Sequence, residues 1–94
     1  MTYKLEFEKR ALKEWKNLGH PIREQLKKKL AERLENPHVP ASRLSGRANR
    51  YKIKLKSSGY RLVYEVIDDK VLLLVIAVGK RADGEVYKQA GKRG

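Results

Sequence analysis

The chain has 94 residues, the size of one small domain. Its 23 Lys and Arg outnumber its 11 Asp and Glu, and the formal net charge of +12 points to a polyanionic partner such as RNA, DNA or an anionic membrane surface. Hydrophobic residues make up 40% of the chain, which argues against disorder, and the absence of Cys excludes disulfide scaffolds, cysteine nucleophiles and cysteine-ligated metal sites.

The first third of the chain predicts a strand followed by two helices. Residues 3–7 alternate polar and apolar, as in a half-buried strand. From residue 8 the apolar residues recur at helical spacing until Gly19, and Pro21 suits the first turn of a second helix. The second helix carries four apolar residues spaced by four: Ile22, Leu26, Leu30 and Leu34. It should end at Asn36, because the residue before a proline is disfavoured in helices.

The remaining two-thirds predict mainly strands. We expect a surface loop at 37–49, strands at 51–56, 60–67 and 71–78 with turns at 57–59 and 68–70, and a weak helix at 85–90. The last strand is apolar throughout, which suits a central strand covered on both faces. Gly91 and Gly94 predict that the final helix is short and frays. The pattern predicts one α+β domain over residues 1–94. It begins with a strand, continues with a helical hairpin packed on a mainly antiparallel sheet, and ends with a short C-terminal helix.

The positive charge is concentrated in one segment. Residues 36–64 contain no acid and seven basic residues: Arg43, Arg47, Arg50, Lys52, Lys54, Lys56 and Arg61. A turn at residues 58–59 would pair Leu55 with Leu62 and Lys56 with Arg61, so that these lysines and Arg61 share one sheet face. Like charges opposite each other destabilise a sheet, and bound phosphates relieve that repulsion. The face is therefore predicted to bind nucleic acid, with Tyr60 and Tyr87 as rings on which bases could stack.

Several catalytic arrangements are absent. His20 and His38 have no metal-ligand partner at the usual spacing and are read as turn and surface residues, and no phosphate-binding Gly-rich loop or acidic triple occurs. A nuclease of this sequence would therefore depend on Lys, Arg and Tyr, without a metal or other cofactor. The longest apolar run, residues 71–78, is too short to span a bilayer, so we expect a cytoplasmic protein without a membrane partner.

The sequence resembles the RelE toxins of bacterial toxin–antitoxin systems. The resemblance covers nearly the whole chain and is carried by residues 51–64 (YKIKLKSSGYRLVY), 78–81 (VGKR), 85–87 (EVY), 11–15 (ALKEW) and 23–30 (REQLKKKL). It implies a RelE-like toxin fold and a metal-independent mRNA interferase that cleaves the codon in the A site of the 70S ribosome by attack of a 2′-hydroxyl. It also implies a RelB-like antitoxin that neutralises the toxin, and contact with operator DNA only through that complex.

The resemblance also assigns site residues. It implies catalytic roles for Lys52, Lys54, Arg61, Arg81 and Tyr87. The resemblance implies that the two lysines act in base chemistry and transition-state stabilisation and that Arg61 holds the phosphate. It implies that Arg81 is a general acid or charge stabiliser for the leaving oxygen, and that Tyr87 stacks on the mRNA base and orients it. We add a second set, expected to bind RNA or the ribosome: Arg43, Arg47, Arg50, Lys56 and Lys80.

Two other functions remain open at this point. A non-catalytic RNA- or ribosome-binding module would use the same basic patch and would bind RNA tightly without producing new RNA ends. A ParE-like gyrase poison shares the overall fold and would damage DNA instead of arresting translation. The combination of basic strand residues with Arg81 and Tyr87 favours the endoribonuclease.

Overall fold

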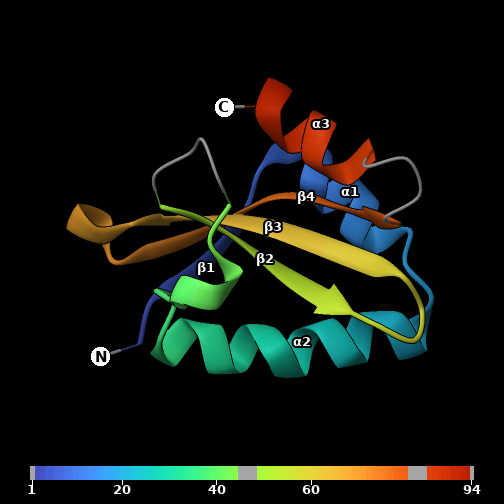
Figure 1. The fold of residues 1–94 in the computed structure, drawn as a ribbon, viewed down its shortest axis with the longest axis horizontal. Coiled ribbons are helices and arrows are strands. Elements are labelled where there is room, and N and C mark those ends of the chain that lie inside the picture. Colours follow the sequence, from blue (N-terminus) through green and yellow to red (C-terminus); the bar gives the residue numbers. More distant parts are fainter. Residues whose placement is uncertain (1, 45–48, 81–84, 94) are drawn as a thin grey trace.

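Every predicted strand and helix is present, in the predicted order (Figure 1). The computed structural model describes residues 2–44, 49–80 and 85–93. Its elements are β1 (Lys4–Phe7), α1 (Lys9–Lys16), α2 (His20–Glu35), a 3₁₀ turn η1 (Pro40–Ser42), β2 (Arg50–Leu55), β3 (Tyr60–Ile67), a 3₁₀ turn η2 (Asp68–Lys70), β4 (Leu72–Lys80) and α3 (Glu85–Lys92). The α+β class is confirmed.

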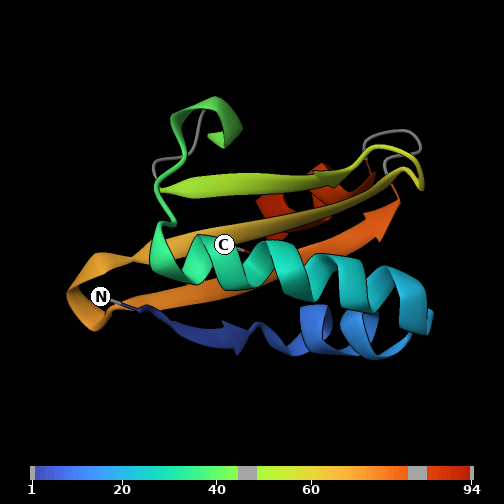
Figure 2. The same cartoon turned by 90° about the horizontal axis from the view of Figure 1, so that it is seen from below.

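The four strands form one mixed sheet in the order β1-β4-β3-β2. β1 runs parallel to β4, whereas β4 with β3 and β3 with β2 pair antiparallel (Figure 2). The predicted central position of the apolar last strand is confirmed, because β4 lies between β1 and β3. Its residues are buried in two apolar clusters, one containing Val75 and Val78 and the other Ile76 and Ala77. The consecutive residues Ile76 and Ala77 share a cluster where the pairing with β3 shifts register between Val63 and Tyr64.

The two faces of the sheet are covered by different helices. Figure 1 shows α2 on one side of the sheet and α3 on the other. Leu26 and Leu30 of α2 are buried in the larger cluster, with Tyr64 of β3 among its other members. α3 places Ala90 in the smaller cluster, beside Val63. The sheet therefore has one face that carries the main core and one that carries a much smaller apolar contact.

Helix α1 continues the chain along the edge of β4 where β1 ends (Figure 2). The Glu8 N–H donates to the Val75 carbonyl at 2.8 Å, and the Glu8 carboxylate caps α1 by accepting from the Arg10 N–H at 2.9 Å. Further along, the Val78 N–H donates to Glu14 Oε1 at 3.1 Å. Beyond the end of β1, the edge of β4 is thus hydrogen-bonded by the Glu8 backbone and the Glu14 side chain.

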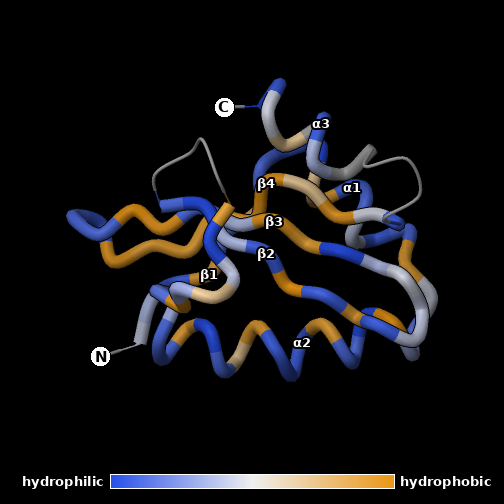
Figure 3. The backbone as a smooth tube through the Cα atoms, viewed as in Figure 1, coloured by the Kyte–Doolittle hydropathy of each residue, from blue (hydrophilic) through white to orange (hydrophobic). Residues whose placement is uncertain are grey.

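The predicted register of the β2–β3 hairpin is wrong by two residues. Leu55 faces Tyr60, and Lys54, not Lys56, faces Arg61. The turn takes the four residues 56–59, closed by a 2.9 Å bond from the Gly59 N–H to the Leu55 carbonyl, and Gly59 adopts a φ of +76° that glycine tolerates best. A shift of two keeps every side chain on its predicted face, so the alternation of basic and apolar residues along β2 persists (Figure 3).

Two further expectations need correction. The segment at 37–49 is not only a surface loop: Pro37 is buried, η1 lies within it, and Arg43 pairs with Tyr51 as an isolated bridge. The final helix runs past its predicted end at residue 90, through Gly91 to Lys92, and the Arg93 side chain that follows it is buried and ion-paired. Within the three described stretches, we find no helix with the length and apolarity needed to cross a membrane.

Candidate active site

Four predicted catalytic residues line one hollow of about 260 Å³. We call it the basic hollow; its lining residues are Leu44, Lys52, Lys54, Arg61 and Tyr87. They come from the segment before β2, from β2, from β3 and from α3, so the sheet and its smaller helix build the site together. The fifth predicted catalytic residue, Arg81, lies outside the described residues. Leu44 is an apolar wall that nothing in the sequence singled out.

Arg61 is fixed by the hairpin turn beneath it. Its side chain is buried, with 7% of the residue exposed, and its Nη1 donates to the Tyr60 carbonyl at 3.0 Å and to the Leu55 carbonyl at 3.5 Å. Among the residues that the structure describes, no carboxylate forms an ion pair with it, and Lys54 lies directly opposite on β2. A buried guanidinium beside a second cation is poised to receive an anion.

The backbone of Lys52 is held from the other side of the strand by Arg33 of α2. Arg33 Nη1 donates to the Lys52 carbonyl at 3.3 Å and to the Tyr64 hydroxyl at 3.0 Å, and its Nη2 donates to Ser42 Oγ at 3.2 Å. The sequence offered no signal for this role, because Arg33 reads as one more cation on a solvated helix face. The contact ties α2, η1 and β2 into one rigid support for the site lysines.

A second depression adjoins the basic hollow. This side hollow, of about 370 Å³, includes five cations in its lining: Lys29, Arg33, Lys52, Lys54 and Lys56. It shares Lys52 and Lys54 with the basic hollow, so the two depressions meet at β2. Lys29 projects into it from α2 and was missed, because helix α2 carries three consecutive lysines that periodicity alone cannot rank.

A polar network supports β2 from the turn η2. His38 Nε2 lies 2.8 Å from Asp68 Oδ1, and His38 Nδ1 lies 2.9 Å from the Tyr51 hydroxyl. The Tyr3 hydroxyl donates to the same Asp68 oxygen at 2.7 Å. The hydrogen bond from His38, followed by that from Tyr3, lowers the pKa of Asp68. Tyr51 stacks on Tyr64, with ring centres 5.5 Å apart. His38 therefore connects buried tyrosines to a turn, a role that its reading as a surface residue did not include.

Tyr60, the hairpin tyrosine predicted to stack on a base, is not among the residues that line the basic hollow. Tyr60 packs against the main core, and the Lys80 ammonium lies 5.7 Å from its ring centre. Of the two predicted stacking rings, Tyr87 is the one that lines the basic hollow.

The second predicted set divides between surface and interior. Arg43 and Lys56 are exposed near β2, and Lys80 is exposed at the end of β4. Arg50 is only 3% exposed, and its guanidinium donates to Glu65 and to the Ala90 carbonyl, which gives it a structural position. Arg47 lies outside the described residues.

The basic hollow suits a phosphodiester with an unpaired base. Its lysines and Arg61 can neutralise phosphate and stabilise charge that develops on it, and the Tyr87 ring offers a stacking surface. In the described part of the chain, no group of three His, Cys, Asp or Glu is placed to hold a metal ion.

Comparison with known proteins identifies the family. Residues 5–84 match the family described as the ParE toxin of the type II toxin–antitoxin system parDE. The mRNA interferase toxin RelE of Escherichia coli strain K12 is 61% identical over 93 residues, which cover 99% of this chain and 98% of that protein. The structure of an E. coli toxin RelE mutant, with two arginines replaced by alanine and solved in the free state, matches with a TM-score of 0.92 at 60% identity. The match covers 99% of this chain and 98% of that one. A chain of the intact E. coli RelBE toxin–antitoxin complex matches with a TM-score of 0.82 at 63% identity, covering 83% of this chain and 95% of that one. The chain belongs to the RelE toxins, within the ParE toxin family of type II toxin–antitoxin systems.

Proposed function

We propose that this toxin is an mRNA interferase, an endoribonuclease that cleaves the mRNA codon in the ribosomal A site. The observation that carries the proposal is the basic hollow, which gathers Lys52, Lys54, Arg61 and Tyr87. These residue types suit RNA cleavage without a metal ion, and a relative with 61% identity is an mRNA interferase.

The proposed reaction is an internal phosphoryl transfer. The 2′-oxygen attacks the adjacent phosphorus, a bond from that oxygen to phosphorus forms, and the bond from phosphorus to the 5′-oxygen breaks. One strand then ends in a cyclic 2′,3′-phosphate and the other begins with a 5′-hydroxyl. A neutral lysine at 52 or 54 accepts the 2′-hydroxyl proton, and Arg61 binds the phosphate. The leaving 5′-oxygen takes up one proton to become the hydroxyl, with Arg81 as its general acid or as the stabiliser of its charge.

The ribosome supplies what the basic hollow lacks. In-line attack requires the 2′-oxygen, the phosphorus and the leaving oxygen to be aligned, and such positioning can account for much of a reaction barrier. We therefore propose that cleavage depends on the ribosome, which places the activity in the cytoplasm. Efficient cleavage of free RNA would contradict this requirement.

The surface cations bind the surrounding RNA in this proposal. Arg43, Arg47, Lys56 and Lys80 contact phosphates of the message or of ribosomal RNA, and the side hollow extends the path beyond the scissile phosphate. Arg50 is left out because its guanidinium is buried and paired. A RelB-like antitoxin neutralises the toxin, and operator DNA is contacted only through the toxin–antitoxin complex; a solved structure of the intact RelBE complex supports the first of these partners.

Mapping of RNA ends on a translated message tests the proposal. Wild type should cut at A-site codons and leave the ends described above, whereas the double variant Arg81→Ala, Tyr87→Ala should not cut. Lys13→Ala on the exposed face of α1 removes a charge away from the hollow and should cut like wild type. Absence of cuts by wild type, or unchanged cuts by the double variant, would overturn the proposal; tight ribosome binding without new ends would indicate the non-catalytic module.

A gyrase poison remains the second candidate, because the matching family is described as a ParE toxin. Pulse-labelling after induction separates the two functions. An mRNA interferase should stop protein synthesis before DNA synthesis falls, whereas a gyrase poison should act on DNA first. The 61% identity to an mRNA interferase favours the first outcome.

A further inference from the structure

Among the described side chains of helix α3, Ala90 and Tyr87 contact the smaller apolar cluster. The helix spans only the eight residues Glu85–Lys92, a length at which an isolated helix is unstable in water. Among its described side chains, Ala90 is buried and Tyr87 is half-buried, whereas Lys88 and Lys92 are exposed. Two buried arginines add polar contacts between this region and the sheet.

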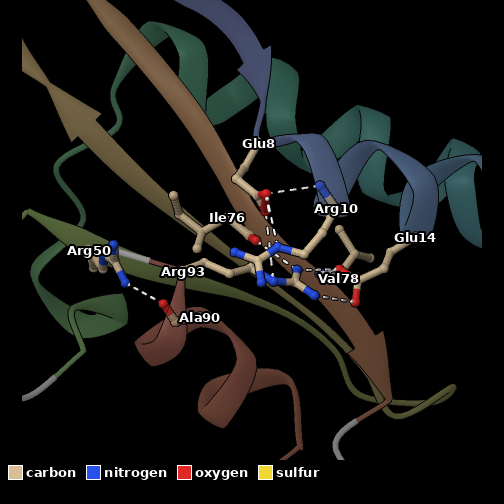
Figure 4. Close-up of polar contacts among 8 residues, drawn as sticks. All are labelled: Glu8, Arg10, Glu14, Arg50, Ile76, Val78, Ala90 and Arg93. Carbon is tan, nitrogen blue, oxygen red and sulfur yellow. Dashed lines mark hydrogen bonds and ion pairs between the residues drawn. The ribbon is translucent and has the colours of Figure 1, made fainter.

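One such contact follows the helix directly. The side chain of Arg93 is only 5% exposed and makes a two-point ion pair with Glu14 of α1, Nη1 to Oε1 at 2.8 Å and Nη2 to Oε2 at 3.1 Å (Figure 4). Its Nη1 also donates to the Ile76 carbonyl of β4 at 3.0 Å, and its Nε lies 3.7 Å from Glu8 Oε2. Paired hydrogen bonds between guanidinium and carboxylate are strong and directional, so the end of α3 is fixed against α1 and β4.

The second contact is made by Arg50, which lies on β2 at the opposite edge of the sheet. Arg50 of β2 donates from Nη1 to the Ala90 carbonyl at 2.7 Å (Figure 4). Its Nε donates to Glu65 at 2.8 Å. The Ala90 carbonyl is in the last turn of α3, where helical carbonyls lack intrahelical partners. The Ala90 carbonyl accepts from the Arg93 N–H at 3.2 Å and also from Arg50, whose guanidinium Glu65 holds in place.

These contacts bear on the site through helix geometry. Tyr87 precedes Ala90 by three residues and lies on the same face of α3, about one turn away. We propose that Arg93 with Glu14, and Arg50 with Glu65, form a two-arginine clamp that positions α3 so that the Tyr87 ring lies in the basic hollow. The clamp residues are positioning residues that do not touch RNA, and their effect on cleavage rests on the function proposed above.

The test separates positioning from charge. Arg93→Ala should reduce the rate of cleavage on translated message by up to about 10²-fold, a loss typical of small displacements of a positioned group, with the toxin's affinity for the ribosome unchanged. Lys92→Ala, which removes the same charge from the exposed neighbouring position, should leave the rate unchanged. Arg93→Lys, which keeps the charge but not the paired geometry, should fall between wild type and Arg93→Ala.

A double-mutant cycle asks whether Arg93 acts through Tyr87. In the Tyr87→Ala background, Arg93→Ala should cause no further loss, because the group that it positions is gone. An Arg93→Ala variant that cleaves like wild type, or that loses the same factor in both backgrounds, would overturn the clamp.

Hydrogen exchange tests the clamp without using activity. The amides of α3 should exchange faster in Arg93→Ala, while those of β3 and β4 keep their wild-type protection. Glu14→Gln should act similarly, since it breaks the ion pair but keeps an oxygen that can accept from the Val78 N–H. Unchanged exchange in α3 of Arg93→Ala would overturn the clamp. If α3 exchanges faster in Arg93→Ala but Tyr87→Ala cleaves message like wild type, the clamp stands and only the proposed function is overturned.

Discussion

The two faces of the sheet are built by different means. On one face α2 is sixteen residues long and buries Leu26 and Leu30 completely against strand side chains. On the other face the eight-residue α3 is contacted by two buried arginines, Arg50 and Arg93, and the face carries a hollow lined by cations. The apolar face supplies stability, and this allows the opposite face to keep like charges together for a ligand.

The arginines at 50 and 61 show the same division within one hairpin. Both are buried, at 3% and 7% exposure, and both come from the acid-free segment. Arg50 faces Glu65 across the strands and is neutralised by it, whereas Arg61 faces Lys54. The pairing across the hairpin, not the composition of the segment, decides which arginine supports the fold and which is available to a phosphate.

The largest expected effect lies on the α2 face. Leu30→Ala should lower the free energy of unfolding by about 2–5 kcal/mol, because it removes a buried side chain and leaves a cavity. Urea unfolding measures this change. Leu12→Ala, at a position that is 37% exposed, is the matched control and should change stability by about 0.5 kcal/mol or less. Equal losses in the two variants would contradict the assignment of stability to the α2 face.

The next effect lies on the opposite face and concerns activity. Arg61→Ala should lower the rate of cleavage on translated message by about 10²–10³-fold, the usual result of removing a group that stabilises developing charge. Its unfolding free energy should fall less than that of Arg50→Ala, because the latter leaves Glu65 without its partner. Cleavage rates and urea midpoints of both variants provide the measurement. A larger stability loss in Arg61→Ala would reverse the comparison between the two arginines.

These contrasts show where sequence reasoning succeeds. The alternation along β2 placed Lys52 and Lys54 on one face, and this part of the site depends only on strand periodicity. The predicted register was wrong because the observed four-residue turn ending in Gly59 and the predicted two-residue turn leave the same side chains on each face of the sheet. The apolar pattern therefore cannot distinguish the two pairings. The burial of Arg50 and the length of α3 also escaped prediction, because they depend on Glu65, 15 residues away, and on Glu14, 79 residues away from its arginine. Local patterns contain no record of such distant partners.

A smaller effect would extend the basic face to the side hollow. The double variant Lys29→Ala, Lys56→Ala removes two of its cations without touching the basic hollow. If each contacts one phosphate, the slope of log affinity for single-stranded RNA against log salt should become shallower by about 1.4. Titrations at several salt concentrations measure the slope. Lys13→Ala with Lys16→Ala on exposed α1 is the matched control, and a slope that changes equally in both variants would remove the side hollow from the RNA path.

The smallest effect returns to the network that joins η2 to Tyr51, on the α2 side of the sheet. Hydrogen bonds from His38 and then Tyr3 lower the pKa of Asp68 below its ordinary value of 3.8. A lowered folded-state pKa contributes stability that is fully present above 3.8 and is lost as the pH falls through the folded value. Asp68→Asn should therefore show a flatter fall of unfolding free energy than wild type below pH 3.8, while the neighbouring exposed variant Asp69→Asn follows wild type.

Because the network supports the stabilising face and not the basic hollow, Asp68→Asn should cleave translated message at the wild-type rate at neutral pH. Reduced cleavage by this variant would show that the two faces are coupled through β2, and the separation of stability from chemistry would then fail at that strand.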